Sequence, residues 1–131
     1  MKKTIIISTI ALCFSIINVN AKPITKNIEI NNSGYLFKVN SFCVSIAKGD
    51  LETVQKLIAR GTDVNEISNG MTPIMYAAKF NRTDILNLLI IHGADLNAKS
   101  DKKMTALDYA KLHGAVDAAN ILKEALSKNE K

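Results

Sequence analysis

The sequence contains few of the residues on which disulfide-rich and nucleic-acid-binding proteins depend. It has no tryptophan, three tyrosines and two cysteines among 131 residues. One cysteine, Cys13, lies in the N-terminal segment that is expected to be removed, so Cys43 alone would remain and no internal disulfide could form. A hydrophobic core must then hold the fold together. Nucleic-acid sites need a stripe of Lys and Arg with aromatic side chains for stacking, and the basic residues here are scattered among acidic ones. We therefore expect no nucleic-acid partner.

Groups suited to catalysis are equally sparse. His92 and His113 stand in different parts of the chain, and neither has a Cys or carboxylate at a spacing typical of metal ligands. No Ser, Cys or Lys has a neighbouring base in a known catalytic motif. The six glycines stand singly, which excludes a glycine-rich phosphate loop. We expect no cofactor, no metal and no enzymatic activity.

Residues 1–21 have the pattern of a cleaved signal peptide. Two lysines precede a largely apolar run from Ile5 to Val19, and a small residue, Ala21, ends the segment. The run is shorter than the roughly 20 apolar residues of a membrane-spanning helix. Cleavage after Ala21 would remove two of the lysines and lower the formal net charge from +5 to +3. We expect a bacterial protein exported to the periplasm or secreted and free of the membrane, with an uncleaved anchor as the alternative.

The stretch 71–97 predicts two short helices joined by a turn. Thr72 can cap the first helix and Pro73 suits its first position, whereas Asn81 and Gly93 favour helix ends. The first helix has a small apolar face of Ile74, Ala77 and Ala78, and the second is crowded with Ile85, Leu86, Leu88, Leu89, Ile90 and Ile91. A helix that is apolar nearly all round should be covered on more than one side.

The neighbouring segments repeat this unit. Residues Gly70–Thr72 recur as Lys103–Thr105 at a spacing of 33, and Leu57–Asn65 resembles Leu89–Asn97 at a spacing of 32. A self-similar period of this length predicts a stacked array of repeats.

Three motifs, TPIMYAA, GAD-x-N at Gly93–Asn97 and GDLETVQKLIARG at Gly49–Gly61, resemble the ankyrin repeat. The resemblance implies an all-α solenoid of about three helix–turn–helix repeats with β-turn tips. The implied segments are an extended arm at 22–39, repeats at 40–70, 71–103 and 104–126, and a charged tail at 127–131 that should fray. The arm is expected to cover the open end of the stack or, alternatively, to bind a partner.

The two outer repeats are expected to be apolar on one side only, because their other side meets water. In the first, Cys43 is interpreted as a small packing residue rather than a reactive thiol, and Leu51, Val54, Leu57 and Ile58 form one stripe. In the third, Val116, Ala119, Ile121, Leu122 and Ala125 should line the last helix, and Asp117, Asn120, Lys123 and Glu124 should face solvent.

The resemblance implies a concave surface that binds another protein. The candidate partner-binding residues are Ser68, Asn69, Met71, Lys79, Phe80, Asp101, Lys102, Met104, Leu112 and His113. Met75 and Asp108 replace a histidine usual in the family, and Asn81-Arg82 replaces a usual Gly-His. Phe80 should be covered either by the next repeat or by a bound partner.

The function that follows from this surface is that of a monomeric, non-catalytic exported scaffold with one protein partner. An inhibitor, immunity or enzyme-protecting protein of the same compartment is the alternative. A blocking role would be favoured by an acidic patch, and none is evident on this surface.

Overall fold

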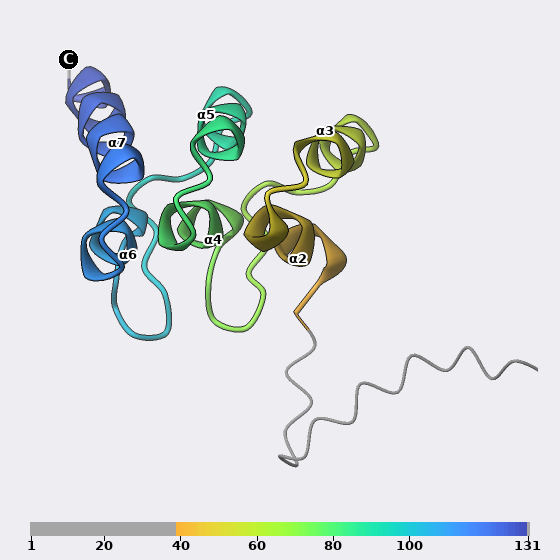
Figure 1. The fold of residues 1–131 in the computed structure, drawn as a ribbon, viewed down its shortest axis with the longest axis horizontal. Coiled ribbons are helices and arrows are strands. Elements are labelled where there is room, and N and C mark those ends of the chain that lie inside the picture. Colours follow the sequence, from red (N-terminus) through yellow and green to blue (C-terminus); the bar gives the residue numbers. More distant parts are fainter. Residues whose placement is uncertain (1–38, 131) are drawn as a thin grey trace, which may run out of the picture. The chain divides into compact units, whose positions relative to one another are not determined.

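Residues 39–130 are described by the computed structural model, and they fold into six α-helices in two layers. Figure 1 shows α2, α4 and α6 side by side in one layer and α3, α5 and α7 in the other. The helices are α2 Ser41–Lys48, α3 Leu51–Ala59, α4 Pro73–Lys79, α5 Thr83–Ile91, α6 Ala106–Leu112 and α7 Val116–Asn129. The expected all-α stack is confirmed for this part of the chain. The predicted leader and almost all of the predicted arm lie outside the described residues.

Side-chain caps and left-handed residues set the helix boundaries. The Asn40 side-chain oxygen accepts a hydrogen bond from the Cys43 N–H at 2.9 Å, and Asp50 caps α3 through the Thr53 N–H at 3.1 Å. Gly49 ends α2 with φ +78°, and Asn81 follows α4 with φ +52°. These conformations are open to glycine and tolerated by asparagine, so the chain reverses at these points.

Helix α4 forms the centre of the core because it packs between α2 and α6. The small face expected from Ile74, Ala77 and Ala78 is confirmed, since all three are fully buried. Leu86 and Leu89 cover it from α5 and are also fully buried. Burying a side chain of leucine size contributes about 1.5–3 kcal/mol, so this layer supplies much of the stability.

The outer layer is less covered than the sequence predicts. Ile91 remains 79% exposed, because α5 contacts its neighbours α3, α4 and α7 and no third layer among residues 39–130 covers its outer side. In α7, Val116 was expected to face inwards but is 66% exposed, whereas Ala118 is fully buried. The helix continues to Asn129, into the segment expected to fray.

The loops between the units form two hairpin tips of different length. Ser68 and Met71 exchange backbone hydrogen bonds across Asn69-Gly70, both at positive φ, which is a two-residue type I′ turn. The second tip spans Ser100 to Met104 and contains three residues, with Lys103 at φ +62°. This additional residue explains why one pair of motifs recurs after 32 residues and the other after 33.

Two residues of the turn between α4 and α5 fasten the middle unit to both neighbours. The Arg82 side chain donates two hydrogen bonds to the carbonyl oxygen of Ala47 in the first unit, at 3.0 and 2.9 Å. The Asn81 side-chain oxygen accepts from the Ala118 N–H at 3.1 Å in the third unit. Asn81 and Arg82, which stand where Gly-His is usual, therefore keep the turn and also bond to both neighbouring repeats.

Candidate functional site

A groove opens on the inner layer between the two hairpin tips and the last turns of α4 and α6. Its volume is about 510 Å³. The lining residues are Asn69, Gly70, Met71, Lys79, Asp101, Lys102, Met104, Tyr109, Leu112 and His113. The structure thus places eight of the ten candidate residues around one groove; that they bind a partner remains a prediction. Sequence reasoning missed Gly70 and Tyr109.

The two tips lie against each other at one wall of this groove. The Asp101 N–H donates to the Gly70 carbonyl oxygen at 3.0 Å, and a Cβ added to Gly70 would collide with the Asp101 carboxylate. A larger residue here would be strained at φ +74° and would have to displace the Asp101 side chain, so both features favour glycine. The Asn-Gly turn signal could have identified the first tip, but not its contact with the second.

Ser68, although a candidate binding residue in the sequence, does not line the groove. It is only 6% exposed. Its hydroxyl oxygen accepts from the Asn40 N–H at 2.9 Å, and its carbonyl oxygen accepts from the Tyr76 hydroxyl at 2.9 Å. Because these bonds use the polar atoms to join two units, Ser68 is structural.

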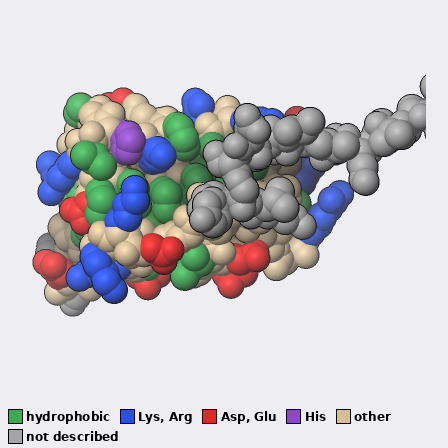
Figure 2. All heavy atoms as spheres, turned by 90° about the horizontal axis from the view of Figure 1, so that it is seen from below, with side chains coloured by type: hydrophobic (Ala, Val, Ile, Leu, Met, Phe, Trp, Pro, Cys, Tyr) green, Lys and Arg blue, Asp and Glu red, His purple; other side chains and the backbone are tan. Residues whose placement is uncertain are grey.

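The groove has an apolar floor, which consists of Met71, Met104, Tyr109 and Leu112. Tyr109 is buried and donates its hydroxyl to Ser100 Oγ at 3.1 Å, so only a small part of its ring meets the groove. Met71 and Met104 are partly buried against the core, and Leu112 is 67% exposed. Figure 2 looks onto this side of the molecule and shows hydrophobic side chains exposed among basic and acidic ones. Exposed leucine beside flexible methionine makes an adaptable apolar surface.

The charged residues that line the groove are mainly basic. Lys79 and Lys102 have no carboxylate within 4.0 Å of their ammonium groups among residues 39–130, and Asp101 is the acidic residue of the lining. The Lys79 ammonium group lies 5.3 Å from the centre of the Phe80 ring. Phe80 does not line the groove, and it stays 42% exposed because its neighbours cover it only in part.

The nucleophiles and possible ligands of the described chain are not arranged for chemistry. Cys43 is fully buried, and burial raises the pKa of its thiol to about 12, so it stays protonated and unreactive at neutral pH. Residues 39–130 contain no group of three or more His, Cys, Asp or Glu that could hold a metal ion. His92 and His113 follow different helices, α5 and α6, as exposed caps.

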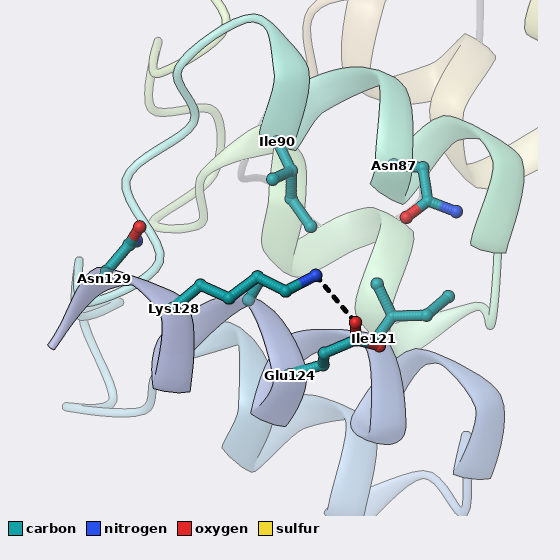
Figure 3. A pocket seen from close by; sticks show the side chains of 7 residues that line it. Asn87, Ile90, Ile121, Glu124, Lys128 and Asn129 are labelled. Carbon is teal, nitrogen blue, oxygen red and sulfur yellow. Dashed lines mark hydrogen bonds and ion pairs between the residues drawn. The ribbon is translucent and has the colours of Figure 1, made fainter. Parts of the chain in front are cut away.

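A second groove of about 420 Å³ lies between the outer helices α5 and α7. Figure 3 shows Ile90 and Asn87 on one side and Ile121, Glu124 and Lys128 on the other. The Glu124 carboxylate and the Lys128 ammonium group pair with each other at 2.7 Å. This groove therefore offers a partner no unpaired charge comparable to the lysines of the inner layer.

Short paired helices, stacked through small residues and joined by hairpin tips, define a helical repeat solenoid. Within that class, residues 42–131 match the family model for ankyrin repeats in three copies. The chain belongs to the ankyrin-repeat family. Ankyrin repeats generally mediate protein–protein interaction.

Among known proteins, the chain is 32% identical over 90 residues to a putative ankyrin repeat protein of Rickettsia bellii, which covers 63% of this chain and 54% of that protein. It is 34% identical over 89 residues to the human NAD-capped RNA hydrolase NUDT12, covering 66% of this chain and 19% of the hydrolase. It is 41% identical over 58 residues to the mouse 2-5A-dependent ribonuclease, covering 43% of this chain and 8% of the ribonuclease.

The chain thus spans about half or less of the length of these relatives. In the two enzymes the matched segments are the ankyrin repeats. The likeness therefore concerns a domain type that is typically non-catalytic. In the described residues, no helix combines the length and apolar character needed to cross a lipid bilayer.

Proposed function

We propose that this protein is a non-catalytic scaffold that binds one protein partner through the groove between its hairpin tips. The observation that carries the proposal is the exposure of Leu112 beside Met71 and Met104. These three apolar side chains converge on one concave surface, and the two tips that hold it are fixed by hydrogen bonds. A rigid apolar groove with a polar rim is the usual form of a binding site.

The test compares two exposed residues of similar size and different location. Leu112→Asp places a charge in the groove, whereas Ile91→Asp places one at the end of α5, where the side chain is also exposed. Capture of a specific partner from the source organism should fall by about tenfold or more with Leu112→Asp and remain unchanged with Ile91→Asp. Both variants should unfold at the wild-type denaturant concentration, because neither side chain is buried. Equal capture by both variants would exclude the groove.

We further propose that the partner is met after export. The basic start, the short apolar run and Ala21 support this part of the proposal. Intact mass of the exported protein should match a chain that begins at Lys22. Protein that retains residues 1–21 and stays in the membrane fraction would favour the anchored alternative.

A further inference from the structure

The distribution of charge around the groove indicates which kind of protein segment it fits. Lys79 comes from the end of α4 and Lys102 from the second tip, and both line the same groove. Neither forms an ion pair among the described residues, whereas Lys56 and Lys128 do so with carboxylates four residues away on their own helices. The groove is therefore lined by two lysines from separate elements that form no ion pair among residues 39–130, and the ammonium group of one of them, Lys79, also lies over the Phe80 ring at the edge of the lining.

The carboxylate of Asp101, which also lines the groove, offsets the positive charge of the two lysines only in part. Asp101 contributes one negative charge, so the two lysines leave the lining with a formal excess of one positive charge. Charges at the rim of an interface attract segments of opposite sign and set the rate and salt dependence of association. A partner segment that carries carboxylates on both sides of the apolar floor would match this arrangement.

The apolar floor distinguishes a protein segment from a nucleic acid. Single-stranded nucleic acids bind on exposed aromatic rings that stack with bases, and the ring of Tyr109 is almost fully buried. The exposed floor consists instead of Leu112 with the partly buried Met71 and Met104. Such side chains form pockets for aliphatic or aromatic anchors.

We propose that the groove takes an acidic protein segment in which carboxylates flank at least one aliphatic or aromatic side chain. The apolar side chain would lie on Leu112 and Met104, and the carboxylates would lie near Lys79 and Lys102. This inference rests on the proposed function, because it specifies the partner of the same groove.

A phage-displayed random peptide library tests the charge preference on the full chain. Peptides selected on the wild type should be enriched in Asp and Glu around an apolar residue. Their affinity should fall by about tenfold in the double variant Lys79→Glu and Lys102→Glu, and it should weaken as salt is raised. The control is Arg60→Glu with Lys123→Glu, which makes the same change of charge at exposed positions outside the groove.

The outcomes separate this inference from the proposed function. Selected peptides that lose binding with Leu112→Asp but carry no acidic residues would keep the groove as a protein-binding site and overturn the acidic preference. Peptides whose binding is insensitive to Leu112→Asp, or no selected peptides at all, would overturn both. Tighter binding of a single-stranded oligonucleotide than of the selected peptides would also overturn the inference.

Discussion

Helices α4 and α6 occupy equivalent positions in successive repeats, but their first turns differ in burial and in hydrogen bonding. In α4, six of the seven residues are buried, and Met75 fills the third position with no exposed surface. In α6 only three are buried, and the equivalent Asp108 is partly exposed. The difference follows from the stack, because α4 has a neighbour on each side whereas α6 has one inner-layer neighbour among the described helices.

The hydrogen bonds at the two starts differ accordingly. The Asp108 carboxylate accepts from both the N–H and the hydroxyl of Thr105, at 2.9 Å each. Met75 offers only a sulfur, to which the Thr72 N–H lies at 3.4 Å, and the buried Thr72 hydroxyl has no partner. A carboxylate in the buried position would lose its hydration, so the fully enclosed repeat gains packing and gives up a hydrogen bond. Thr72 and Met75 therefore keep the positions of a capping box, but the Thr72 hydroxyl makes no side-chain cap hydrogen bond.

The largest expected effect comes from shortening equivalent apolar residues, Ile74 in α4 and Leu107 in α6. Ile74→Ala should lower the free energy of unfolding by about 2–5 kcal/mol, because Ile74 is fully buried and leaves a cavity. Leu107→Ala should cost at least about 1 kcal/mol less, because Leu107 is only partly buried and the cavity opens to solvent. Urea unfolding followed by circular dichroism measures both. Equal losses would show that the two helices are equally enclosed.

The next effect concerns the two threonines. Thr105→Val should lower the free energy of unfolding by about 0.5–2 kcal/mol, because it removes a hydroxyl that donates to Asp108 and accepts from its N–H. Thr72→Val keeps the shape of the side chain and removes a hydroxyl without a partner, so its effect should be near zero or stabilising. A loss in Thr72→Val as large as that in Thr105→Val would mean that the Thr72 hydroxyl is hydrogen-bonded.

The tips provide a smaller effect of opposite sign. Lys103 adopts φ +62°, where a side chain is strained, whereas the first tip places Gly70 at φ +74°. Lys103→Gly should raise the free energy of unfolding by about 0.5–1 kcal/mol by relieving this strain. Lys102→Gly, one residue earlier, is the control and should be neutral or destabilising. Thermal unfolding of the two variants distinguishes them.

The smallest effect is a dependence on pH. Hydrogen bonds from the N–H and hydroxyl of Thr105 lower the pKa of Asp108 in the folded protein. A lowered pKa means that the stabilisation is complete well above the ordinary value of 3.8 and is lost as the pH falls towards the folded value. The stability advantage of the wild type over Asp108→Asn should therefore be constant from about pH 7 to 5 and shrink in more acidic solution. An advantage that grows on acidification would contradict this assignment.

The number and type of helices followed from local signals in the sequence. Asn40, Asp50, Asn81 and Gly49 act within a few residues of the backbone groups that they cap or turn, so their effect needs no knowledge of distant neighbours. The repeat period likewise predicted stacking, because a single unit cannot bury its apolar face alone. Eight of the ten candidate groove residues were found because repeats place equivalent positions on one surface.

Burial and contacts between units were decided only by the tertiary structure. Ser68 is a residue type common in turns, but it is buried, and Asn40 and Tyr76 donate hydrogen bonds to it from other parts of the chain. Ile91 and Val116 are apolar and yet exposed, since their coverage depends on whether another layer lies outside them. The sequence thus determined what each unit is, and the packing of one unit on another decided which of its side chains meet solvent, because exposure is a property of neighbours distant in the chain.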